Sequence, residues 1–222
     1  MILAIDATAE QCSAALLIKG QIISRSQHAP RDHTQMLLSF VDSLLKEAQT
    51  TLQQLDAIAF GAGPGSFTGI RIAAAMVQGL AFGASKPVIP ISSLRAIAFE
   101  TYERTGAKSV MAALDARKNE VYWGLYKWDE KAGMLLQGEE SVVAPQNAHL
   151  PKGLSHWVGA GSGFHAYGSI LKEHTQDREA SVHPELFPEA QAIAKLAAFD
   201  LARGLTVSAE EAIPTYIRNN IL

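Results

Sequence analysis

Cysteine is almost absent from this chain, because Cys12 is the only one among 222 residues. A single cysteine cannot form a disulfide within the chain, which favours a reducing compartment and a fold that depends on packing. Cys12 lies in a strand-like run, where a small buried hydrophobic role is favoured over a reactive thiol. We therefore expect a cytoplasmic protein.

Charged and aromatic residues are also scarce, at 18% and 7% of the chain. The 19 basic residues are outnumbered by 22 acidic ones, and the net charge of -3 argues against a protein that binds nucleic acid by itself. No apolar run approaches the ~20 residues of a membrane span. Asp6 also comes too early for a signal peptide, so we expect no membrane association.

Apolar residues are plentiful, at 48% of the chain, which is enough for one large domain or two small ones. Their spacing predicts strands at residues 2–5, 12–18, 21–26, 55–60, 88–91, 109–115, 120–128 and 134–143. It predicts helices at residues 32–48, 68–84, 92–105, 164–173 and 188–204.

The second half of the sequence repeats the organisation of the first. Each half opens with an apolar strand that ends in an aspartate, Asp6 or Asp115. The glycine-rich stretch 61–67 is echoed by residues 159–164. This repetition predicts two duplicated α/β domains, one over residues 1–106 and one over 107–222, with the terminal segment packing back on the first.

Residues 61–71 are the stretch most indicative of function. They hold four glycines and a proline, lie between a predicted strand and a predicted helix, and match neither a P-loop nor a dinucleotide fingerprint. Backbone N–H groups at such a helix start suit an anion, and a tight turn without a ligand is the alternative. The candidate nucleotide- or anion-binding residues are Asp6, Gly63, Gly65, Ser66, Thr68 and Arg71.

Six segments together resemble the TsaB family, also called YeaZ. They span nearly the whole chain, at residues 1–10, 30–35, 63–71, 114–117, 120–123 and 216–220. The resemblance implies the actin-like/sugar-kinase/Hsp70 ATPase fold, built from two duplicated α/β domains with mixed sheets. It also implies a role in tRNA modification, in which a threonylcarbamoyl group passes from threonylcarbamoyl-AMP to the adenosine beside the anticodon.

The resemblance further implies a division of labour among partners. TsaB-like proteins act with the paralogue TsaD, which carries the catalytic metal, and with the ATPase TsaE. The TsaD-like paralogues place two metal-binding histidines four residues apart, and here those positions are Ser93 and Ile97. We therefore expect no metal site, no catalytic residue and no required cofactor in this chain, with weak nucleotide binding as the alternative.

The resemblance places the partner surface on the predicted helices 32–48 and 68–84. The second of these helices is small or apolar nearly all round, which predicts burial on several faces. The expected partners are a TsaD-like paralogue, or a second copy when the chain is alone, and tRNA only through the complex. The candidate contact residues are Met36, Leu37, Phe40, Ala73, Met76, Val77 and Leu80.

Two other functions fit the same fold. One is an ATP-binding small-molecule kinase or ATPase that uses Asp6 and Asp115. The turn after Asp6 lacks the glycines that usually let a phosphate approach, which counts against it. The other is a peptidase, which the missing histidine pair disfavours.

Overall fold

The computed structural model describes residues 1–28, 33–148, 156–174 and 181–217. Contacts between Cα atoms divide the chain into two compact units. Unit 1 consists of residues 1–96 and 188–215, and unit 2 of residues 97–187 and 216–222. The first division therefore falls at Ala96, ten residues before the boundary expected from the sequence, and a later segment returns to unit 1.

Unit 1 is built on a five-stranded mixed sheet in the order β3-β2-β1-β4-β5. An antiparallel meander is formed by β1 (Ile2–Asp6), β2 (Gln11–Ile18) and β3 (Gln21–His28). On its other side β1 pairs in parallel with β4 (Ala57–Gly63), which pairs in parallel with β5 (Val88–Ser92). Every residue of β1 and β4 is buried, as expected for central strands covered on both faces.

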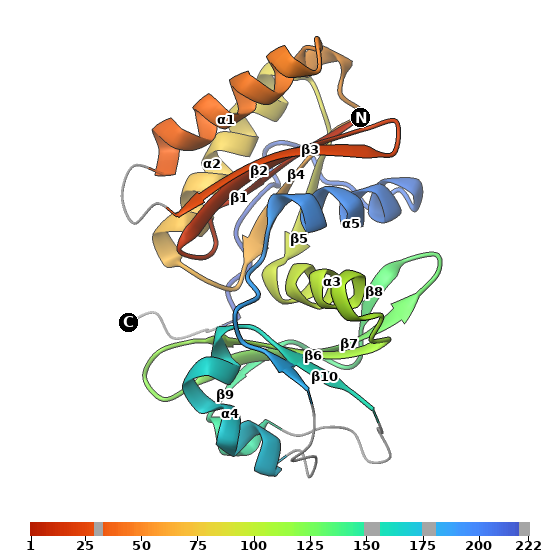
Figure 1. The fold of residues 1–222 in the computed structure, drawn as a ribbon. Coiled ribbons are helices and arrows are strands. Elements are labelled where there is room, and N and C mark those ends of the chain that lie inside the picture. Colours follow the sequence, from red (N-terminus) through yellow and green to blue (C-terminus); the bar gives the residue numbers. More distant parts are fainter. Residues whose placement is uncertain (29–32, 149–155, 175–180, 218–222) are drawn as a thin grey trace. The chain divides into compact units, whose positions relative to one another are not determined.

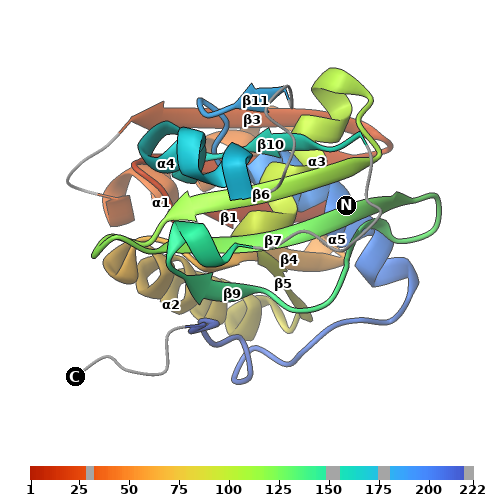
Figure 2. The same ribbon diagram turned by 90° about the horizontal axis from the view of Figure 1, so that it is seen from below.

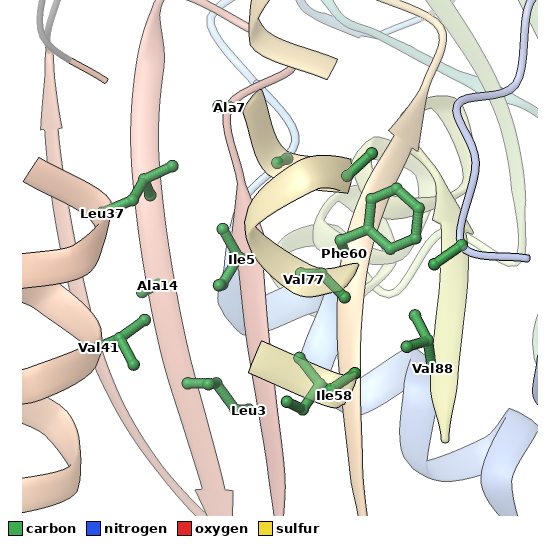
Figure 3. Close-up of a cluster of buried hydrophobic side chains, with 14 of the residues drawn as sticks. Leu3, Ile5, Ala7, Ala14, Leu37, Val41, Ile58, Phe60, Val77 and Val88 are labelled. Carbon is green, nitrogen blue, oxygen red and sulfur yellow. The ribbon is translucent and has the colours of Figure 1, made fainter. Parts of the chain in front are cut away.

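Helices cover both faces of this sheet (Figure 1). One face carries α1 (His33–Glu47) and α2 (Phe67–Ala84), and the other carries α5 (Ala190–Ala202). Figure 3 shows Leu37 and Val41 of α1 and Val77 of α2 reaching the side chains of the central strands. These residues belong to the main hydrophobic core of unit 1.

Two polar contacts fix α5 in unit 1. The hydroxyl oxygen of Ser13 in β2 accepts a hydrogen bond of 2.9 Å from the backbone N–H of Ala190. Asp200 forms a paired salt bridge with Arg95, with Nη1 and Nη2 at 2.6 and 3.0 Å from its two carboxylate oxygens. Both side chains of that salt bridge are largely buried. The late return of the chain to unit 1 therefore rests on specific bonds as well as on packing.

Unit 2 is built on a six-stranded sheet in the order β11-β10-β6-β7-β8, with β9 pairing with β7 (Figure 2). Its strands are β6 (Ser109–Asp115), β7 (Val121–Asp129), β8 (Gly133–Leu136), β9 (Ser141–Val143), β10 (Val158–Ala160) and β11 (Val182–His183). Its helices are α4 (Ser162–His174) and most of α3 (Ser93–Thr105). Two 3-10 turns, Leu52–Gln54 and Pro145–Asn147, complete the elements of the described residues.

The predicted duplication is confirmed by the strand order. In unit 1 the two strands that follow β1 lie on one side of it, and β4 and β5 lie on the other. In unit 2 the strands β7 and β8 lie on one side of β6, and β10 and β11 lie on the other. The parallel and antiparallel pairings also correspond. The mixed α/β class and the predicted actin-like fold are therefore correct.

Two boundaries differ from the sequence-based expectation. The strand expected at 134–143 is two strands, because β8 pairs with residues 126–129 of β7 and β9 pairs with residues 121–123. The strand expected to end at residue 60 continues to Gly63, because β5 runs beside it and pairs with Gly61 and Gly63. The first residues of the glycine-rich stretch are thus strand, not loop.

Candidate functional site

The glycine-rich stretch joins β4 to α2 and begins the helix. Ser66 is the N-cap residue of α2, and its hydroxyl oxygen accepts a hydrogen bond of 3.3 Å from the backbone N–H of Gly69. The backbone N–H of Ser66 donates to the carbonyl oxygen of Thr8 at 2.7 Å. Two of the N–H groups at this helix start are therefore used inside the chain.

The glycines of this stretch allow close packing on the turn that follows β1. A Cβ atom on Gly65 would lie 2.2 Å from the carbonyl oxygen of Thr8, and one on Gly69 would lie 1.8 Å from that of Ala7. No side chain fits at such distances, because the neighbouring atoms are backbone. The turn after β1 is thus packed directly against the backbone of the glycine-rich stretch.

Asp6 lies beneath the same loop and is fully buried. Its carboxylate accepts hydrogen bonds from the hydroxyl of Thr8 at 2.9 Å and from the N–H of Thr8 at 3.3 Å. Burial, with a smaller contribution from the charge of Glu189, raises the pKa of Asp6 to about 7 although the Thr8 bonds oppose the shift. Asp6 is therefore held by hydrogen bonds within its own turn, and its side chain is not exposed to solvent.

The predicted anion-binding residues differ in their exposure to solvent. Asp6 and Gly63 are buried, whereas Ser66, Thr68 and Arg71 are exposed. The guanidinium of Arg71 lies 3.8 Å from the centre of the Phe67 ring, in a cation–π contact. Nucleotide or anion binding at these residues stays a prediction, and the packing of the loop gives it no support.

The inner face of α2 belongs to the core of unit 1. Ala73 and Val77 are fully buried, and so is Leu37 of α1. These three predicted contact residues therefore offer no surface to a partner, and a charge at Val77 would disrupt the core instead of only breaking a pairing. Met36, Phe40, Met76 and Leu80 are partly buried and pack against the core from its edge.

The outer face of α2 carries four residues that are not among the predicted contact residues. Ala75, Gly79, Phe82 and Gly83 are exposed and follow one another at helical spacing, so they form one stripe. Phe82 is 72% exposed, the largest value among the exposed large hydrophobic side chains of the described residues. We call this stripe of four residues the outer α2 face.

The two glycines of the outer α2 face are not required by packing against any of the described residues. A Cβ atom on Gly79 or Gly83 would meet nothing within 4 Å. Glycine inside a helix costs about 0.5–1 kcal/mol relative to alanine. Small residues beside an exposed aromatic ring allow another helix to approach closely. The outer α2 face therefore has the features of a helix-packing surface.

The sequence did not indicate on which side of α2 this stripe lies. By length and composition α2 could even cross a membrane, because its apolar residues surround the axis. Only the pairing of its inner face with the sheet shows which small residues point outward. The spacing of Gly79 and Gly83 could have suggested a close approach, but it could not indicate the side.

No group of three or more histidine, cysteine, aspartate or glutamate side chains is placed to hold a metal ion within the described ranges. Ser93, at one of the two positions where the paralogues carry histidine, is fully buried. Its hydroxyl has no hydrogen-bond partner among the described residues.

Comparison with protein families and curated proteins gives consistent matches along the chain. A family model described as "TsaD: tRNA N6-adenosine threonylcarbamoyltransferase" matches residues 21–221. The protein named "tRNA threonylcarbamoyladenosine biosynthesis protein TsaB" of Escherichia coli is 39% identical over 99% of this chain and 95% of its own length. The protein of that name from Haemophilus influenzae is 36% identical over 99% and 94%.

Solved structures agree in both fold and sequence. The structure titled "YeaZ from Pseudomonas aeruginosa" superposes with a TM-score of 0.90 and is 44% identical, covering 97% of this chain and 98% of that one. A second structure, titled as an uncharacterized protein with similarity to peptidase YEAZ from Pseudomonas aeruginosa, gives a TM-score of 0.91 at 43% identity over 98% and 99%.

Proposed function

This chain belongs to the TsaB family of tRNA threonylcarbamoyladenosine biosynthesis proteins, and from that premise we propose that it is the non-catalytic partner of a TsaD-type enzyme. The two proteins pair through the outer α2 face. The observation that carries this proposal is the stripe of Ala75, Gly79, Phe82 and Gly83, whose two helical glycines have open space around them.

The similarity between the chain and its partner supports a helix-to-helix contact. The family model named for TsaD matches most of this chain, so a TsaD-type partner has an equivalent fold and an equivalent second helix. Two such helices with small residues on their outer faces pack closely and bury the exposed ring of Phe82. Leu38 of α1, which is 49% exposed, adds apolar area on the neighbouring helix.

We propose two further partners, and the outer α2 face accounts for the first of them. Without the TsaD-type protein, a second copy of this chain covers the outer α2 face and gives a homodimer with two-fold symmetry. The TsaE-type ATPase binds the assembled pair. Transfer of the threonylcarbamoyl group takes place on the TsaD-type subunit, and this chain stabilises that subunit in its active arrangement.

The first experiment mixes the purified chain with its TsaD-type paralogue. We expect the two proteins to co-elute in gel filtration, and we expect modification of a tRNA transcript to require both of them with the TsaE-type ATPase. Separate elution, or full modification without this chain, would overturn the proposal.

The surface itself is tested by replacing Gly79 with arginine. Gly79→Arg places a long charged side chain on the outer α2 face, so co-elution and tRNA modification should both be lost, while the urea midpoint of the free chain should not fall because a helical glycine is removed. The matched control is Gly168→Arg in α4, another helical glycine whose Cβ would meet nothing within 4 Å. If Gly79→Arg pairs as well as Gly168→Arg does, the partner binds elsewhere.

A further inference from the structure

The turn between β6 and β7 has a backbone conformation that residues other than glycine rarely adopt. Arg117, Lys118 and Asn119 have φ angles of 61°, 54° and 58°, so three consecutive residues with side chains adopt the left-handed region. Such residues normally occur singly, and glycine adopts this conformation without steric cost. Arginine and lysine here are held in an unfavourable conformation, a feature that concentrates at functional sites.

Internal hydrogen bonds hold this turn in one arrangement. The N–H of Ala116 donates to the carbonyl of Glu120 at 2.9 Å, and the N–H of Glu120 donates to the carbonyl of Arg117 at 3.1 Å. The carboxylate of Asp115 accepts the N–H of Arg117 at 2.8 Å and its guanidinium at 3.2 Å. The side chain of Arg117 is nevertheless 80% exposed, and Lys118 and Asn119 are exposed as well. The backbone of the turn is thus held in one arrangement, and its two cations and one amide lie on the surface.

The corresponding turn of unit 1, between β1 and β2, differs from this turn in both its backbone angles and its burial. It follows Asp6 in β1 as this one follows Asp115 in β6, and in both turns the aspartate accepts the N–H two residues later. Its residues 7–10 carry no positive φ, and Ala7 and Thr8 are buried beneath the glycine loop. The turn of unit 2 is one residue shorter than that of unit 1. It connects the paired strand residues Asp115 and Val121, whereas the turn of unit 1 connects Asp6 and Ser13. The shorter connection needs left-handed residues, but it does not need cationic ones.

From these observations we infer that the Arg117–Lys118 turn contacts the phosphate backbone of the tRNA in the assembled complex. The inference rests on the proposed function, since it needs a tRNA substrate. Arginine and lysine bind phosphate oxygens through charge-assisted hydrogen bonds, and Asn119 adds a neutral donor. Because the chain as a whole carries a charge of -3, contact with RNA requires local cations of this kind.

The test compares three variants of the complex between this chain and its TsaD-type partner, with an unmodified tRNA transcript as the probe. Arg117→Gly/Lys118→Gly removes both charges and supplies the residue that the backbone favours. Arg117→Ala/Lys118→Ala removes the charges but keeps the strain. Lys131→Ala removes an exposed lysine from the turn at the opposite end of β7, where the backbone is ordinary, and serves as the control.

We expect both double variants to bind tRNA roughly tenfold more weakly near physiological salt, with a salt dependence shallower by about 1.5 in the log–log slope. Lys131→Ala should bind as the unchanged chain does. The glycine variant should also melt at a higher temperature than the alanine variant and the unchanged chain, so that greater stability accompanies weaker RNA binding.

Three results would overturn the inference. One is unchanged tRNA affinity in both double variants, and the second is a loss of equal size in Lys131→Ala. The third is loss of co-elution with the TsaD-type partner in the double variants, which would make the turn a protein contact. Co-elution of the unchanged chain is measured separately, so failure of the proposed function is distinguished from failure of this inference.

Discussion

A Cβ atom on Gly69 would lie 1.8 Å from the carbonyl oxygen of Ala7, so the first turn of α2 and the turn after β1 are in backbone contact. This contact sets where α2 begins, and with the Ser66 cap it aligns the helix on the sheet. The glycine-rich stretch therefore fixes the position of the helix that carries the outer α2 face.

The first prediction follows from this contact. Gly69→Ala should lower the free energy of unfolding of unit 1 by about 2 kcal/mol or more, because the neighbouring atom is a carbonyl that must move with its strand. Urea denaturation followed by circular dichroism measures the effect. Gly79→Ala is the matched variant in the same helix, and it should raise the free energy of unfolding by about 0.5–1 kcal/mol. Equal effects of the two variants would contradict the proposed role of Gly69.

The second prediction concerns the affinity of the same Gly79→Ala variant for the TsaD-type partner. A methyl group on the outer α2 face should weaken pairing with the TsaD-type partner while it stabilises the free chain, because it separates two closely packed helices. We expect a loss of affinity of about tenfold, equivalent to 1.4 kcal/mol, in titration calorimetry. Phe82→Ala should lose affinity too, with little change in stability, because its ring is exposed in the free chain. Pairing that is insensitive to both changes would exclude this face.

The third prediction concerns the salt bridge between Arg95 and Asp200. Asp200→Ala should destabilise the chain by about 3–5 kcal/mol, because it leaves the guanidinium of Arg95 buried without its carboxylate. Asp42→Ala provides the comparison, since its salt bridge with Lys46 is exposed and worth less than about 1 kcal/mol. Thermal unfolding of both variants separates the two cases, and similar shifts would mean that Arg95 finds water or another acceptor.

Most of the fold could be predicted because its signals are local. Apolar runs ending in Asp6 and Asp115, and two glycine-rich turns, were enough to predict the duplication. Periodicity could not place the outer α2 face, because a helix that is apolar all round has no distinct phase. The roles of Ala73 and Val77 depended on which face meets the sheet, and that is a tertiary property. The positive φ angles of the turn at Arg117 could not be predicted either, since neither arginine nor lysine indicates a positive φ.

The fourth prediction is a dependence of stability on pH that arises from Asp6. Its pKa is about 7 in the folded chain against 3.8 for an ordinary aspartate, so the folded state binds more protons than the unfolded state between these values. The stabilisation from protonated Asp6 is therefore complete below about pH 4 and is lost as the pH rises toward and through 7. Its size is a few kcal/mol, because each unit of pKa shift is worth about 1.4 kcal/mol.

Asp6→Asn isolates this effect, because asparagine keeps an acceptor for Thr8 and does not ionise in this range. The midpoint of urea unfolding should fall between pH 5 and pH 8 for the unchanged chain and should fall much less for Asp6→Asn. The two proteins share all other titrating groups, so the difference between the two pH profiles reports on Asp6 and on its coupling to neighbouring groups such as Glu189. Parallel profiles would show that the carboxyl ionises at an ordinary pKa, and the buried contact with Thr8 would then have to admit water.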